Sequence, residues 1–545
     1  MTGSVGHHGR RGCRLLCLLV GQNKPNGSHY YPALLQPLGT HDASCNHPDF
    51  DVTDLPRPDP LKYRVDLKKV VTSLTNTEYE AQRLLTGIRK ASIFDCLPRI
   101  LEPPTCFPSD IMHQPVINLT GLMFDLWCGR EACHKGDRDS VWDLAVLKGD
   151  VWRTHGKAVA DAASYFPRSF DRTPRNPAEK LSSGCKAWEL LLYFYGLGPG
   201  LFYGVLPQKY YLHYCKLVVG IRIIYQRRIA RPQLKHAHKL LFEWVLEFEL
   251  LYYQRKIERL HFVQQCVHSL THLGPETDRI GPPSLSAQWT MERMIGILGS
   301  LINQPSNPFA NLTEQAKKIV EVNALVAMWP DLEHPKPTPT VPSTSAADTS
   351  YLVLKTRSPT IYLISNKPRF KISTLVSRVP RTSHRVLFID GDDSKFPTSK
   401  SPVPIGKRWC AHLEQRVPIR ILRYTNLPNL CLTFINVTLQ VLHQGAIRIV
   451  EARFYFRADV SGTRETLVLC SLYSPADEQL NRTTHGALNV FEYKGEDALI
   501  IIQATAVLSV VTMVPFSERD QRHPARFFLV EKFSLGVVDT GIILD

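Results

Sequence analysis

The chain has 545 residues, of which 44% are hydrophobic and 21% are charged, and its formal net charge is +15. This length exceeds one ordinary domain and predicts about two to four of them. The balance of apolar and charged residues excludes a disordered or fibrous chain and indicates a globular protein with a buried core. The excess of positive charge favours an acidic partner, and nucleic acid is the commonest one.

The sequence predicts neither a membrane anchor nor a disulfide framework. The apolar run at residues 15–20 is short for the core of a signal peptide, and no small-residue cleavage site follows it. The apolar run at residues 498–514 contains Gln503 and Ser509, and its Val and Ile content favours buried strands over a membrane span. The 13 cysteines are scattered, which predicts reduced thiols in an intracellular protein.

The first 110 residues are weakly periodic and rich in Pro, His and Asp, so we expect loops and short elements there. One group in this part has metal-ligand chemistry: Cys13, Cys17, Cys45 and His47. They could form a Cys3His zinc site, although the long gap between its halves makes the signal weaker than a pair of Cys-x-x-Cys motifs. Buried, reduced cysteines are the alternative interpretation.

The segment FPSDIMHQP, residues 107–115, places Asp110 and His113 three positions apart before a new element. Such a pair could position a metal, or the aspartate could cap a helix, and capping is the favoured interpretation.

Residues 178–323 are predicted to be helical. The stretch 233–273 contains neither proline nor glycine, so it predicts one very long helix or two stacked helices. Residues 216–242 contain seven basic residues and no acid, which could follow a phosphate backbone without reading base sequence. A solvated charged helix is the alternative. These basic residues are Lys216, Arg222, Arg227, Arg228, Arg231, Lys235 and Lys239.

Three histidines, His261, His268 and His272, share one face of the predicted helix that ends near residue 276. The spacing of His268 and His272, one turn apart, suits metal ligation. Partly buried histidines that only form hydrogen bonds are the favoured interpretation.

The segment 288–309 has an apolar stripe on one face of a predicted helix, and Glu292, Gly296 and Gly299 on the other. Glycine costs about 1 kcal/mol relative to alanine inside a helix. The two glycines therefore indicate either close packing against another helix or room for a ligand to approach Glu292.

A segment rich in Pro, Thr and Ser at residues 334–350 predicts an extended linker. Residues 351–450 alternate poorly. From Ala452 the runs ARFYFR, LVLCSLYS, ALIIIQATAVLSVV and RFFLVEKF predict β-strands that are separated by turns.

Several long strings carry a resemblance to a known family. They are GLGPGLFYGVLP, KLVVGIRIIYQ, ELLYYQRKIERLHFVQQCVHSLTHLGPE, QWTMERMIGILGSLINQPSNPFANL and, near the end, FFLVEKFSLGVVDTG. They resemble transposases of the CACTA (En/Spm) superfamily, in its fungal branch. The resemblance extends over about residues 9–332 and 452–545, with a blurred segment between.

The resemblance implies an α+β fold, namely an incomplete ribonuclease-H-like core with a large all-helical insertion, a linker and a small β-rich C-terminal domain. It divides the chain into four parts. Residues 1–114 would be a Cys/His-containing remnant of the catalytic core, and residues 115–332 the helical region that ends in the WTMER motif. Residues 333–450 would be a linker and a poorly matched segment, and residues 451–545 the β-rich domain.

The family's chemistry implies three carboxylates that hold Mg²⁺ for phosphodiester cleavage and strand transfer in the nucleus. By motif position Glu292 is the candidate for the third acid. The first two catalytic Asp residues have no counterpart here, so we expect a transposase-derived chain that is inactive by itself. The alternatives are a domesticated, non-enzymatic DNA- or protein-binding protein, and an active transposase completed by upstream exons. DNA is the expected partner, a homo-oligomer stays open, and Zn²⁺ is the candidate ion for the Cys3His group.

Overall fold

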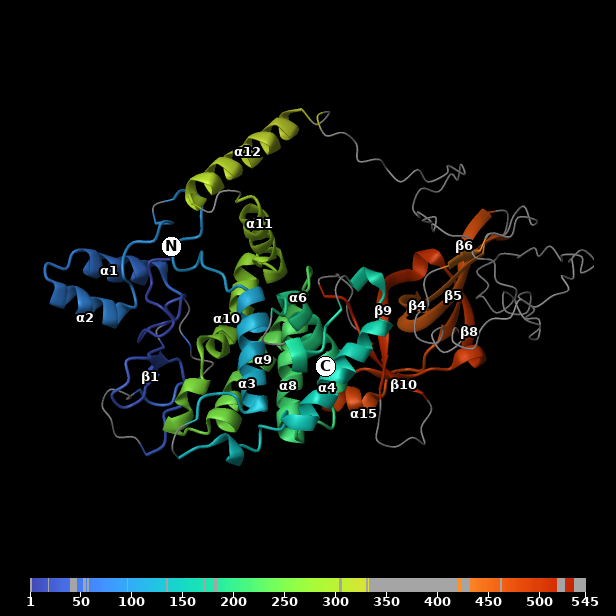
Figure 1. The fold of residues 1–545 in the computed structure, drawn as a ribbon, viewed down its shortest axis with the longest axis horizontal. Helices are drawn as coiled ribbons and strands as arrows, with labels where there is room; N and C mark the ends of the chain where they lie inside the picture. Colours follow the sequence, from blue (N-terminus) through green and yellow to red (C-terminus); the bar gives the residue numbers. More distant parts are fainter. Residues whose placement is uncertain are drawn as a thin grey trace, which may run out of the picture.

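The computed structural model shows a protein of mixed helix and strand, with a helical region and a curled sheet near the C-terminus (Figure 1). It describes residues 2–332 and 420–533. Within these ranges, residues 18, 40–46, 52–54, 56–57, 96, 134–135, 171–172, 181–183, 303–305, 330–331, 423–431, 461–462 and 517–524 are not described. The predicted linker at residues 334–350 therefore lies outside the described residues, as does most of the segment 351–450 that follows it.

The N-terminal part contains two helices that its weak periodicity does not indicate. The short strands β1 (Gln22–Asn23) and β2 (Tyr30–Tyr31) pair antiparallel, and α1 (Pro60–Val71) and α2 (Asn76–Thr86) follow. The side chain of Thr75 accepts the N–H of Glu78 at the start of α2, and Gly87 ends it in the left-handed conformation, with φ 77°. Local capping signals therefore form these helices.

The helical region contains ten α-helices within the described ranges. They are α3 (Thr120–Cys128), α4 (Gly149–Ala162), α5 (Pro177–Lys180), α6 (Ala187–Leu190), α7 (Gly198–Leu201), α8 (Gln208–Ile224), α9 (Arg231–Phe248), α10 (Gln265–Ile280), α11 (Trp289–Ser300) and α12 (Pro308–Met328). Shorter π and 3-10 segments join them, namely η3 (Met112–Leu119), η4 (Asp139–Val141), η5 (Ala163–Tyr165), η6 (Arg168–Phe170), η7 (Leu191–Leu197), η8 (Glu249–Tyr253), η9 (Ile257–Phe262) and η10 (Pro283–Leu285). No described helix is both long and apolar enough to cross a membrane.

Aromatic side chains dominate the core of the helical region. Trp127 and Trp244 are fully buried, and the indole N–H of Trp127 donates to the hydroxyl of Tyr252 at 3.2 Å. Gly220 permits the close contact of α8 with α9, because a Cβ at this position would lie 2.7 Å from the Leu241 side chain. By contrast, α11 and α12 contain no buried residue, and Figure 1 shows α12 projecting away from the helical body.

The long stretch without proline or glycine forms two helices rather than one. Helix α9 runs into the π turn η8, and the chain then breaks at Gln254 and Arg255, which both have positive φ, 55° and 54°. The Arg255 side chain donates to the carbonyl oxygen of Gln36 at 2.8 Å and to Asp49. Tertiary contacts with the N-terminal segment thus accompany a break that the local sequence does not signal.

The predicted C-terminal strands are present, and the sheet begins earlier than expected. Its strands are β3 (Arg420–Leu422), β4 (Leu432–His443), β5 (Ala446–Val460), β6 (Thr463–Leu472), β7 (Val490–Glu492), β8 (Leu499–Gln503), β9 (Val507–Pro515) and β10 (Arg526–Val530), with helix α15 (Glu478–Thr483) between β6 and β7. The order is β7-β10-β9-β4-β5-β6-β8, all pairs are antiparallel, and β3 pairs with β4. An antiparallel bridge between Tyr473 and Tyr493 brings the end of β6 to the end of β7.

The sheet shares a hydrophobic core with the helices. Phe528 on β10 lies against α7, where a Cβ on Gly200 would come within 2.5 Å of its ring. Val530 and Phe533 belong to the same buried cluster as the helical aromatics. The C-terminal strand β10 therefore packs on the helical region.

Candidate metal centre

Two segments that are far apart in the chain supply a group of metal-binding side chains. Cys13 and Cys17 lie on the N-terminal segment, where the N–H of Leu16 donates to the carbonyl oxygen of Cys13 and closes a tight turn. His268 and His272 lie one turn apart on α10, so both rings leave the same face of this helix. Helix geometry orients the two imidazoles, and the turn between the cysteines brings the two sulfurs to the same point.

The distances within this group match a tetrahedral zinc site. The Sγ atom of Cys13 lies 3.3 Å from Nε2 of His272, the Sγ atom of Cys17 lies 3.3 Å from Nε2 of His268, and the two Nε2 atoms are 3.0 Å apart. All four donor atoms lie within 4.8 Å of one another. Zinc bond lengths to sulfur and nitrogen give tetrahedral edges of about 3.6 Å between S and N and about 3.3 Å between two nitrogens. The three shortest contacts are about 0.3 Å shorter than these edges, so the four donor atoms converge on one point that an ion could occupy.

Burial also suits a metal ion. The four residues are between 0% and 7% exposed. The pKa of the Cys13 thiol lies well below its ordinary value, chiefly because Cys17 hydrogen-bonds to it, and the neighbouring His272 adds to this effect. Burial opposes the charged form of His272, but the Cys13 thiolate raises the pKa of that imidazole. Zinc binds the thiolate form of cysteine, which Cys13 favours, whereas the hydrogen bond with Cys13 and burial raise the pKa of the Cys17 thiol. A metal ion would therefore have to displace the Cys17 proton and the proton that His272 holds.

The structure combines two groups that the sequence analysis treats separately. Cys13 and Cys17 meet the His268–His272 pair, and His47 is not part of the group. Nδ1 of His47 lies 2.7 Å from the carbonyl oxygen of Pro48, and its ring meets Phe50 edge-on. Cys45 lies outside the described residues. Among the described residues, Cys13 and Cys17 thus form a Cys2His2 set with the two histidines of α10. Each pair is separated by three residues, and this spacing was the local signal for the set.

Glu292 lies in the first turn of α11, with its side chain 46% exposed. Its Oε1 is 3.6 Å from Nε2 of His113, and Nδ1 of His113 contacts Asp110. The Asp110 carboxylate accepts the backbone N–H of Gln288 at 3.0 Å and of His113 at 3.1 Å. The predicted capping role of Asp110 is therefore confirmed, and the same carboxylate also holds the start of α11.

The face of α11 beside Glu292 is open within the described structure. A Cβ added to Gly296 or to Gly299 would meet no described atom within 4 Å. These glycines therefore do not mediate close helix packing here, which was the alternative interpretation of their spacing.

The basic residues of the segment 216–242 divide into two classes. Arg222 points inward and donates to the carbonyl oxygens of Tyr195, Gly196 and Ala487 at 2.8, 3.3 and 2.9 Å. Lys216 is held by two glutamates of α9. The exposed class consists of Arg227, Arg228, Arg231, Lys235 and Lys239. Arg222 is therefore a structural cation, contrary to its predicted role in DNA binding, because it joins the helical region to the segment before β7.

Comparison of the chain with models of known protein families, with curated proteins and with solved structures finds no match. The site is therefore interpreted through its own chemistry. Among the described residues, the Cys2His2 group is the single convergence of three or more His, Cys, Asp or Glu side chains suited to an ion.

Proposed function

We propose that this chain is a zinc-stabilised, DNA-binding protein derived from a CACTA-type transposase with a ribonuclease-H-like ancestry, and that it acts in the nucleus. The observation that carries the proposal is the buried Cys2His2 group, which fastens the N-terminal segment to α10. Helix α10 leads through η10 directly into α11 and its WTMER motif. A metal at this point would fix the part of the chain in which the resemblance to transposases is most specific.

The chemistry of the donor set favours a structural role for the ion. Four protein ligands fill a tetrahedral zinc shell, whereas catalytic zinc sites keep one position for water or substrate. The ion would therefore stabilise the fold and take no part in bond cleavage. The test is the zinc content of the purified full chain, for which we expect one equivalent. Absence of zinc from protein that is purified and refolded with the metal would refute the metal centre.

DNA binding is supported by the exposed basic residues after α8 and along α9. Arg231, Lys235 and Lys239 follow one another at intervals of four residues, so they form a stripe on one face of α9. Arg227 and Arg228 in the preceding connection extend the stripe. Such a surface contacts phosphates and carries little sequence information.

The salt dependence of DNA affinity tests this surface. Each phosphate contact contributes about 0.9 to the slope of log K against log salt concentration. The double variant R231E/K235E should therefore lower the slope by about two and weaken binding. The matched control is K317E/K318E, which makes the same charge change on α12. An equal loss in both variants would show that only net charge matters and would refute the stripe.

Cleavage by this chain has less support than binding. Glu292 is the counterpart of the family's third acid, but the nearby Asp110 carboxylate accepts backbone N–H groups from two elements and serves as a cap. Two-metal phosphoryl transfer requires several carboxylates around the ions. We therefore propose binding without cleavage. Mg²⁺- or Mn²⁺-dependent nicking of DNA by the purified chain, abolished in Glu292→Gln, would overturn this part of the proposal.

A further inference from the structure

His268 uses one ring nitrogen for the metal centre and leaves the other without a partner. Its Nε2 faces Cys17 and His272, so a bound metal requires the proton of this neutral imidazole to lie on Nδ1. Nδ1 is buried and has no hydrogen-bond partner among the described residues. Metal-binding histidines almost always donate this second N–H to a carboxylate, a carbonyl or a water, which fixes the ring and its tautomer.

Gln265 offers the missing acceptor. It lies three residues before His268 on α10, so the two side chains are neighbours on one face of the helix. Its Oε1 is also buried and also lacks a partner among the described residues. Two complementary polar atoms that are both buried and unpaired on adjacent positions of one helix indicate a shared partner, since buried polar groups are rarely left unpaired.

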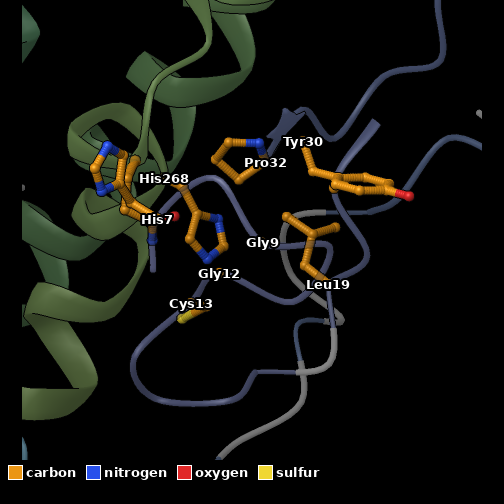
Figure 2. Close-up of a pocket in the computed structure, with 10 residues that line it drawn as sticks. His7, Gly9, Gly12, Cys13, Leu19, Tyr30, Pro32 and His268 are labelled. Atoms are coloured by element: carbon orange, nitrogen blue, oxygen red, sulfur yellow. The ribbon is translucent and has the colours of Figure 1, made fainter. Parts of the chain in front are cut away.

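A small cavity connects these two residues. Gln265 and His268 both line it. Figure 2 shows His268 beside Cys13 and the loop that carries Gly9 and Gly12. The space open to the centre of a water molecule is about 10 Å³. This is roughly the room that one buried water needs. Gly9 and Gly12 line the cavity with backbone only, and the side chains of His7, Leu19, Tyr30 and Pro32 complete the wall.

We propose that Gln265 is a positioning residue of the metal centre, which acts through one water molecule in this cavity. The water accepts a hydrogen bond from Nδ1–H of His268 and donates one to Oε1 of Gln265. This bridge holds the His268 ring with Nε2 directed at the metal and fixes the tautomer that ligation needs. The inference rests on the proposed metal centre and adds a residue that no ligand-spacing motif contains.

The test measures zinc affinity of the full chain by competition with a chromophoric chelator, for the wild type, Gln265→Ala and Gln265→Glu. Loss of an outer-shell partner should weaken zinc binding roughly 10- to 100-fold in Gln265→Ala. Gln265→Glu should bind zinc as tightly as the wild type, because a carboxylate also accepts a hydrogen bond in support of a ligand histidine. Gln264→Ala is the matched control, since Gln264 is the preceding residue and does not line the cavity.

The outcomes separate this inference from the metal centre itself. If the wild type binds no zinc, the metal centre fails. If the wild type binds zinc but Gln265→Ala binds it equally well, or Gln264→Ala loses as much affinity, the positioning role fails. The absorption spectrum of the Co²⁺-loaded variants should keep its tetrahedral S2N2 form, which shows that the four ligands are retained and that the variant is folded. A zinc affinity of Gln265→Glu as low as that of Gln265→Ala would also overturn the proposal.

Discussion

Replacement of Cys13 by serine tests whether the Cys2His2 group holds the fold together. Cys13 is 6% exposed, and serine is close to it in size, so the substitution leaves little cavity. Its main effect is the loss of a thiolate ligand. The contacts of Cys13 with His272 and of Cys17 with His268 span 259 and 251 residues. Loss of the ion therefore removes a link between the N-terminal segment and α10.

The size of the effect follows from the linkage between binding and folding. An ion that binds only the folded state stabilises it by about 4 kcal/mol when the free metal is roughly 1,000 times its dissociation constant. Each kcal/mol corresponds to roughly 2–4 °C for a unit of 150–250 residues. Because the helices and the sheet share a core and form a larger unit, we expect Cys13→Ser to lower the melting temperature by at most roughly 8–16 °C and to lose the zinc equivalent. A strong chelator should have the same effect on the wild type.

The assay combines zinc content with thermal unfolding in the presence and absence of chelator. Cys266→Ser is the matched control, because Cys266 lies on α10, is 3% exposed, and burial raises the pKa of its thiol to about 12. This control should keep its zinc and its sensitivity to chelator. The reasoning would be refuted if Cys13→Ser retained a full zinc equivalent, or if chelator left the melting temperature of the wild type unchanged.

Three further predictions concern the other residues of the candidate site and the core. His47→Ala should keep the zinc equivalent and His272→Ala should lose it, and the reverse pattern of metal content would restore the Cys3His set. Burial lowers the pKa of His155 to about 4, whereas the unfolded chain binds this proton near pH 6.5. The free energy of unfolding should therefore fall by about 3 kcal/mol as the pH decreases from about 6.5 to about 4, and this part of the slope should be absent in His155→Gln on urea unfolding. Arg222→Leu should cost about 2–3 kcal/mol of stability in urea, since three carbonyls lose a charged donor, without changing the salt slope of DNA binding per folded molecule. A lower slope in Arg222→Leu would return this residue to the DNA-binding surface.

Local patterns were sufficient to predict much of the secondary structure. The alternation and β-branched content after Ala452 predicted strands that the structure contains, and the apolar run at 498–514 forms β8 and β9. Strand β4 was missed although Val437, Leu439 and Val441 alternate with Thr438 and Gln440, because the alternation is confined to a few residues of the long segment 351–450. The break between α9 and α10 also has no local signal, because Gln254 and Arg255 are ordinary helix formers that adopt positive φ at a point where Arg255 contacts Gln36 and Asp49.

The same distinction between local signals and tertiary contacts applies to the candidate metal centre. The sequence by itself determined which residues have metal-ligand chemistry, because the type of side chain and the spacing within a turn or helix are local properties. It marked Cys13 and Cys17 in one place and His268 and His272 in another. Only the tertiary structure decided that these two halves meet and that Arg222 is internal. The physical reason is that contacts across more than 250 residues depend on how helices pack, and short-range spacing does not encode this.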